Sequence, residues 1–282
     1  MMKTFRYMTI AALSLLMAAC SSNDDFTSSQ VSTTGRGIPF TATVSRDGNT
    51  TRTVLTEDAT NGTIAAAWET DDELALVYQV GSVTKVTKAT VTAQSDKTAT
   101  ITATLDEGVT EGTAVTLIYP YDAVISDSEN PKYGTVSYGD LTVQEGTLAS
   151  IAKKYAICQG DGTLTIASGT ASLKADVTMA SQMAIWKLSL TDGTNALKTK
   201  QLLIYKDGAP ENMLVNALLQ DGAEANSVFY IAVPAVSSKN LTIEATVDDK
   251  TYYYSKKGVT LEAGKYYQST VTMTMVQAVI IQ

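Results

Sequence analysis

Side chains branched at Cβ alternate with small or apolar side chains along most of this chain, and this pattern limits the possible folds more than any other feature. Threonine repeatedly stands between Val, Ile, Leu and Ala. Alternation with a period of two is typical of strands that bury one face. We therefore predict an all-β chain. The predicted strands are Ile38–Val44, Leu74–Val80, Ala99–Leu105, Ala114–Tyr119, Gly162–Ala167, Ile185–Leu190, Gln201–Tyr205, Val228–Val233, Leu241–Val247 and Val271–Val276.

Turn signals separate many of these strands. Asp-Gly and Asn-Gly pairs accept the positive φ angles of the tight turns that join antiparallel strands. Helical periodicity is weak, and Asn212–Leu219 (NMLVNALL) is the best helical candidate. Many short strands with turns between them favour β-sandwiches. The predicted turns are at Asp47-Gly48, Asn61-Gly62, Asp161-Gly162, Asp192-Gly193, Asp207-Gly208 and Asp221-Gly222.

Residues 1–19 are predicted to be a secretion signal. Lys3 and Arg6 precede the apolar run Tyr7–Ala19, which is shorter than the roughly 20 residues that a membrane-spanning helix needs. The end of this run and Cys20 resemble a bacterial lipobox, in which the cysteine sulfur is acylated and anchors the chain. Met17 departs from the Leu or Val usual in that motif. The alternative is an ordinary signal peptide followed by a chance cysteine.

The rest of the 282 residues divides into a tether and two predicted domains. Residues 20–36 are rich in Ser and Thr, and their acidic start resembles the surface-export signal of Bacteroidetes lipoproteins, although a solvated tether would look the same. We predict one sandwich over residues 37–175 and a second over residues 176–282, with a long surface loop at Ser126–Gly146. No repeat of 20–50 residues is evident, which argues against a propeller or a solenoid.

Composition excludes several classes of function. The chain has no histidine, so nucleophile systems and zinc sites that depend on histidine are excluded. The net charge of −8 argues against nucleic acid as a partner. No metal site is predicted, because the acidic cluster Asp71–Glu73 lacks EF-hand spacing. Trp68 is interpreted as a core aromatic residue and Cys158 as a small buried one.

Several weak motifs, taken in order, resemble the fimbrillin family of Bacteroidales lipoproteins. An arginine-containing segment and a short strand precede a tryptophan, an acidic turn and an apolar strand, and further motifs follow in the second half. The resemblance covers most of the chain beyond the signal. The motifs are Thr51-Arg52-Thr53, Gly62-Thr63-Ile64, Trp68–Leu74, Met179–Leu190, Phe229–Pro234 and Leu261–Tyr267.

This resemblance implies a structural, non-enzymatic subunit of a type V pilus or fimbria, built from two tandem transthyretin-like, Greek-key β-sandwiches without a cofactor. In that family an Arg-specific protease removes the first strand of a lipidated precursor, and a strand of the next subunit fills the groove by donor-strand exchange. The implied partners are other pilin subunits, the surface protease, the lipoprotein export machinery and, before cleavage, the outer membrane. The implied location is the cell surface, where the pilus serves cell adhesion.

Specific residues match these parts. Ile38, Phe40, Ala42 and Val44 form the apolar face of the first predicted strand, which would be the removable one. The polar segment after it contains arginines that look exposed, as proteolytic sites tend to be. The family pattern favours cleavage after Arg52, with Arg46 second and Arg36 third, and the alternative is that all three are ordinary surface arginines.

The donor strand would be the C-terminal tail. Thr and apolar residues alternate up to Met275, and the chain then becomes nearly all apolar. An uncharged, β-prone terminus of this kind is prone to aggregate unless a partner covers it. The alternative is that the tail is only the last strand of its own domain. The proposed donor residues are Val276, Val279, Ile280 and Ile281.

Two other classes of function stay open at this point. One is a monomeric, surface-exposed lipoprotein that binds glycans or host ligands, which would present exposed Trp and Tyr side chains. The chain has two Trp, and both Trp68 and Trp186 lie in strand-like contexts. The other is an enzyme with a carboxylate pair, for which no acidic spacing gives support.

Overall fold

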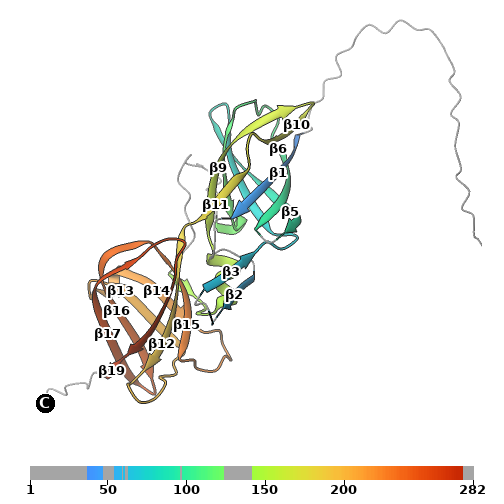
Figure 1. Ribbon diagram of the computed structural model, residues 1–282. Helices are drawn as coiled ribbons and strands as arrows, with labels where there is room; N and C mark the ends of the chain where they lie inside the picture. Colours follow the sequence, from blue (N-terminus) through green and yellow to red (C-terminus); the bar gives the residue numbers. More distant parts are fainter. Residues whose placement is uncertain are drawn as a thin grey trace, which may run out of the picture. The chain divides into compact units, whose positions relative to one another are not determined.

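The computed structural model describes residues 37–46, 54–58, 60, 63–95, 97–123 and 142–275, and these residues form four β-sheets with a few short helical turns (Figure 1). The prediction of an all-β chain is therefore confirmed. Every segment predicted as a strand overlaps a strand of the structure.

Eight strands form the first sheet. Its ladder runs β1-β11-β9-β7-β4-β5-β6, with β10 paired to both β1 and β9, and β6 pairs back to β1. The hydrogen-bonded ladder is therefore a closed ring, and apolar side chains of its strands meet in one core. The strands are β1 (Ile38–Arg46), β4 (Glu73–Val80), β5 (Val83–Ser95), β6 (Thr98–Leu105), β7 (Ala114–Tyr119), β9 (Cys158–Ala167), β10 (Thr170–Leu173) and β11 (Val177–Ser181).

The second half forms a six-stranded and a three-stranded sheet, with a second core between apolar side chains of both. The six-stranded sheet has the order β19-β17-β16-β13-β14-β8, and the three-stranded sheet has the order β15-β12-β18. The strands are β8 (Val143–Gln144), β12 (Met183–Thr191), β13 (Gln201–Lys206), β14 (Met213–Leu218), β15 (Val228–Pro234), β16 (Val236–Val247), β17 (Lys250–Leu261), β18 (Tyr266–Thr272) and β19 (Thr274–Met275).

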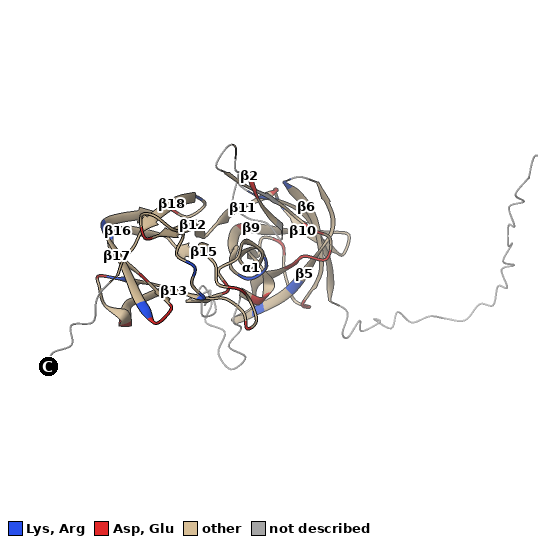
Figure 2. Ribbon diagram, turned by 90° about the horizontal axis from the view of Figure 1, so that it is seen from below, with Lys and Arg blue, Asp and Glu red and all other residues tan. Residues whose placement is uncertain are grey.

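The remaining elements are short. The hairpin of β2 (Val54–Asp58) and β3 (Thr63–Ala67) is a sheet of its own. A single helical turn, α1 (Leu148–Ser150), continues into a π-turn, η2 (Ile151–Tyr155), and two 3-10 turns are η1 (Tyr121–Ala123) and η3 (Pro210–Asn212). Lysine, arginine and acidic residues are scattered over the strands in the view of Figure 2.

The structure differs from two local predictions. Asn212–Leu219 was the best helical candidate, but Met213–Leu218 is β14, since pairing on both sides with β13 and β8 overrides a weak helical pattern. Asp161-Gly162 was a predicted turn, but β9 runs straight through it. A Cβ at Gly160 would lie 2.5 Å from a methyl group of Val177, so the glycines of this strand allow a close approach of β11.

The chain leaves the eight-stranded sheet at Ser181, the end of β11, and enters the three-stranded sheet at Met183, the start of β12. β11 pairs with β1 and β9 in the first sheet, and β12 begins the second half. The expected division after residue 175 would separate β11 from the strands with which it pairs. In addition, β8 lies in the six-stranded sheet although its residues precede β9.

Candidate functional site

The candidate site is the place of β1 within the closed first sheet. Phe40, Ala42 and Val44 are buried in the first core, and Ile38 packs partly buried against it. The side chains between them point outward, as the Thr and Ser at these positions require. Strand β1 therefore fills a groove with one apolar face, in the way that the sequence pattern predicted.

The two sides of β1 are paired unequally. On one side its residues pair antiparallel with β6 without interruption, from Ile38 opposite Leu105 to Ser45 opposite Thr98. On the other side the pairing is parallel, with one pair to β10 and three pairs to β11. Parallel pairing is slightly the weaker kind per residue. Removal of β1 would open the ring and leave unpaired backbone groups along β6, β10 and β11.

The end of β1 places a charged side chain in an aromatic slot. The guanidinium carbon of Arg46 lies 3.4 Å from the ring centre of Trp68 and 4.3 Å from that of Tyr119. The two rings meet edge to face, with centres 5.5 Å apart. Arg46 is 5% exposed and Trp68 is 1% exposed. We call this arrangement the aromatic slot.

The expectation that Arg46 is exposed is therefore wrong. Its backbone N–H donates to the carbonyl of Lys97, and the residue pairs with Met179, so β1 continues two residues beyond its predicted end. Because side chains alternate along a strand, Arg46 points to the same face as Val44. A protease would have to pull this strand end apart to bind the side chain. The other two candidates, Arg36 and Arg52, lie outside the described residues.

The hairpin after β1 packs against a different core. Leu55 of β2 and Ile64 of β3 lie in a third apolar cluster with Ile151, Met183 and Ile185. Of these, Met183 and Ile185 belong to β12 of the second half. Strand β1 therefore contributes to the first core and the β2–β3 hairpin to this third cluster, and residues 47–53, which include Arg52, connect the two elements in the sequence.

A network of polar side chains fixes β2 in its place. Lys187 Nζ donates to both carboxylate oxygens of Glu57, at 2.7 and 2.9 Å. The hydroxyl groups of Tyr230 and Tyr266 donate to the same carboxylate. Burial by itself would raise the pKa of Glu57, but the three donors outweigh it and hold this pKa below its usual value. The hydrogen bond to Glu57 raises the pKa of Lys187.

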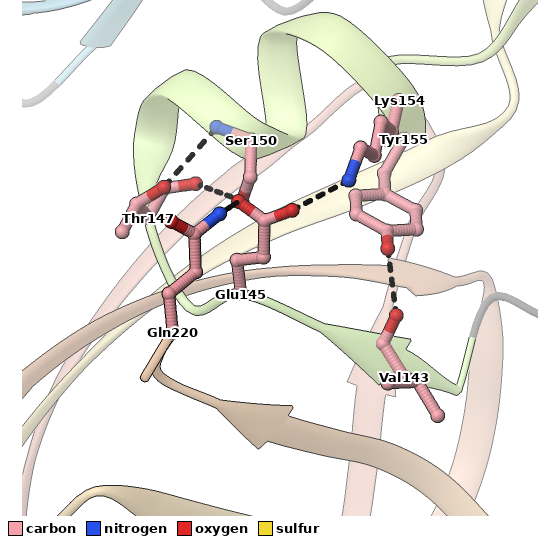
Figure 3. A network of polar contacts seen from close by, with 7 residues as sticks. All are labelled: Val143, Glu145, Thr147, Ser150, Lys154, Tyr155 and Gln220. Carbon is pink, nitrogen blue, oxygen red and sulfur yellow. Dashed lines mark hydrogen bonds and ion pairs between the residues drawn. The ribbon is translucent and has the colours of Figure 1, made fainter. Parts of the chain in front are cut away.

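The segment around β8 is also tied to the second half. Gln144 donates to the carbonyl of Ala232 and accepts from its N–H, at 2.7 and 2.9 Å. Glu145 next to it accepts from Lys154 and from Gln220 (Figure 3). Figure 3 also shows the Tyr155 hydroxyl pointing to the carbonyl of Val143.

The described chain ends on an outer strand. After β18 the chain passes Met273, which is buried, and Thr274–Met275 then pair with β17 as β19. The proposed donor residues Val276, Val279, Ile280 and Ile281 lie outside the described residues, as does the predicted lipidation site Cys20.

Neither tryptophan forms an exposed platform for a glycan. Trp68 is in the aromatic slot, and Trp186 is 6% exposed and donates from Nε1 to Ser269. Trp186 lines a cavity of about 390 Å³ between β17 and β18.

Among the described residues there is no group of acidic or cysteine side chains that could hold a metal ion. No helix within the described ranges is long and apolar enough to cross a membrane. Cys158 is buried, as predicted.

Sequence reasoning missed both polar features of this site. The sequence could have indicated that Arg46 is buried, because alternate residues of a strand face the same side and Phe40, Ala42 and Val44 are apolar. The signal for Glu57 was absent, since its partners lie 130 to 209 residues further along the chain.

Comparison with known proteins gave structural but no sequence matches. Neither a protein-family model nor a curated protein sequence matches the chain. Among solved structures, a putative cell adhesion protein from Bacteroides ovatus matches with a TM-score of 0.46 and 16% identity, over 86% of this chain and 96% of that one.

Two further matches are fimbrial proteins. One from Bacteroides ovatus has a TM-score of 0.41 and 15% identity over 84% of this chain, which spans only 48% of that protein. The tip fimbrial protein Mfa3 from Porphyromonas gingivalis has a TM-score of 0.31 and 11% identity, over 79% of each chain.

Proposed function

We propose that this chain is a fimbrial subunit, made as a lipidated precursor and activated when a protease cuts after Arg52 and releases β1. One observation carries the proposal: β1 closes the ring of the first sheet, while the next element, β2–β3, packs against another core. A cut between them frees β1 and leaves the hairpin held by Glu57. The buried position of Arg46 supports Arg52 as the site of cleavage.

Release of β1 would create an acceptor for another strand. The groove would expose apolar side chains of the first core together with unpaired N–H and C=O groups of β6, β10 and β11. Each buried polar group left unpaired costs about 1–3 kcal/mol. An extended segment of a second subunit that pairs with both edges would remove this penalty, which is strand addition. The C-terminal tail beyond Met275 is the proposed donor, and the resulting polymer would serve adhesion at the cell surface.

Limited trypsin digestion of the full secreted chain tests the proposal. We expect one early cut after Arg52, detected by N-terminal sequencing, followed by filaments in the electron microscope. Arg52→Ala should stay uncut and monomeric, and Arg46→Ala, the matched control, should still be cut after Arg52. Many simultaneous cuts without assembly would contradict activation and favour a monomeric binding protein.

The donor role has its own test. Deletion of residues 277–282 should leave a folded monomer that is cut as before but no longer polymerises. Normal filaments from this truncated chain would exclude the tail as the donor, whatever the site of cleavage.

A further inference from the structure

The aromatic slot holds hydrogen-bond donors without acceptors. All three guanidinium nitrogens of Arg46 and Nε1 of Trp68 are buried and have no hydrogen-bond partner among the described residues. Arginine and the indole ring can donate but cannot accept. Contact of the cation with the ring faces offsets part of the penalty for the buried charge, and the buried N–H groups stay unsatisfied.

This mismatch indicates which side chain would fit the slot better. The slot needs an acceptor for Nε1 of Trp68, and it offers ring faces to a planar group. A glutamine side chain has a carbonyl oxygen that can accept this bond, and its planar amide is uncharged. Replacement of a donor-only group by an amide would therefore satisfy a buried donor and remove a buried charge.

The C-terminal tail has a glutamine at a position that can be aligned with Arg46 while apolar residues of the tail align with the apolar face of β1. The segment Val276–Gln282 reads VQAVIIQ, and the end of β1 from Phe40 to Arg46 reads FTATVSR. With Ala278 in the place of Ala42, Val276 takes the place of Phe40 and Ile280 that of Val44. Gln282 then takes the place of Arg46 in the aromatic slot.

Other registers fit less well. If the tail were shifted by one residue so that its odd-numbered side chains faced the core, Gln277 would bring its amide among fully buried apolar side chains. If the tail ran in the opposite direction with Ala278 in the same place, Thr274 would occupy the slot. Thr274 is already paired with Tyr253 in β19. The same direction as β1 also restores the antiparallel ladder to β6.

We infer that the aromatic slot of Trp68 and Tyr119 is a recognition subsite for Gln282 in the tail of a second copy, with Ala278 in the place of Ala42. This inference rests on the proposed function, because the slot must first be vacated by release of β1. It explains why exchange is favourable at this end of the groove: Arg46 leaves with the released strand, and an acceptor for Trp68 enters.

The test uses the full chain after cleavage and synthetic peptides of residues 274–282, whose affinity is measured by competition against a fluorescent copy of the unmodified peptide. Gln282→Leu should weaken binding about tenfold, the effect of one buried hydrogen bond. Gln277→Leu is the matched control and should bind as the unmodified peptide does, because residue 277 faces outward. Val276→Phe should bind more tightly, since it fills the place of Phe40.

A double-mutant cycle identifies the partner. In Trp68→Phe, which lacks the indole N–H, the unmodified and Gln282→Leu peptides should bind with equal affinity. Equal binding of these two peptides to the unmodified protein would overturn the inference while leaving tail donation intact. A loss with Gln277→Leu in place of Gln282→Leu would also overturn it, since the other face would point inward. No binding of any tail peptide, with rebinding of a peptide of residues 38–46, would overturn both the inference and the donor assignment.

Discussion

Glu57 of β2 and Lys187 of β12 form an ion pair at 2.7 Å although 130 residues separate them in the chain. Both side chains are largely shielded from solvent, and the hydroxyl groups of Tyr230 and Tyr266 complete the contacts of the carboxylate. The pair joins the hairpin that follows the proposed cleavage site to the second half of the chain. It is therefore the contact that would hold the new N-terminal end in place.

Substitution Glu57→Gln should destabilise the chain by about 1–3 kcal/mol, because charge-assisted hydrogen bonds from Lys187 and two tyrosines become neutral ones. Denaturant unfolding followed by tyrosine fluorescence measures this change. The matched control is Glu73→Gln, which breaks the exposed pair with Lys88 and should cost less than about 1 kcal/mol. Equal effects of both substitutions would show that the Glu57 network adds nothing beyond a surface pair.

The same network predicts a loss of stability in acid. Burial opposes ionisation of Glu57, but donors from Lys187, Tyr230 and Tyr266 prevail and lower its pKa in the folded chain. The stabilisation is therefore fully present above the unfolded pKa of about 4.3 and is lost as the pH falls through the lower folded value. The melting temperature should drop below about pH 4 in the unmodified chain and drop less in Glu57→Gln. Parallel curves for the two proteins would contradict this assignment.

Substitution Arg46→Met should stabilise the uncleaved chain by about 1–3 kcal/mol, because it removes a buried charge without hydrogen-bond partners and keeps an apolar stem in the aromatic slot. Denaturant unfolding of the full chain is the measurement. Lys174→Met, at an exposed position of the same half, should change stability by less than about 0.5 kcal/mol. A clear loss of stability in Arg46→Met would mean that contact with the rings outweighs the penalty of the buried charge.

Substitution Gly160→Ala should destabilise the first sheet by about 1–3 kcal/mol, since its Cβ would lie 2.5 Å from a methyl group of Val177 and 3.0 Å from the carbonyl oxygen of Thr178. Thr163→Ala, at an exposed position of the same strand, is the control and should be nearly neutral. Thermal unfolding measures both variants. If Gly160→Ala is as stable as the control, β11 can move away from β9 without penalty.

Alternation predicted the strands well because it reports a local property, the burial of every second side chain. It therefore identified the apolar face of Ile38, Phe40, Ala42 and Val44 correctly. It could not show that β6 pairs back to β1, since strand order depends on contacts between distant segments.

The local rules failed where distant contacts decide the outcome. Asp161-Gly162 reads as a turn, yet its pairing with Thr116 and Val115 of β7 makes it part of a strand. Arg46 reads as a surface charge in the sequence, and only the extension of β1, whose last residue contacts Lys97 and Met179, places it inside.

The closed ring also sets an order in time for folding. Strand β1 is made first, but Leu105, the antiparallel partner of Ile38, and Val177, the parallel partner of Val44, are made about 70 and 130 residues later. Such long sequence separations slow folding, because the ends of a long loop must meet before the contact stabilises anything. The apolar face of β1 must therefore wait uncovered while the rest of the sheet is synthesised. The ring can therefore close only when β1, the first strand of this sheet to be synthesised, pairs with β11, the last one.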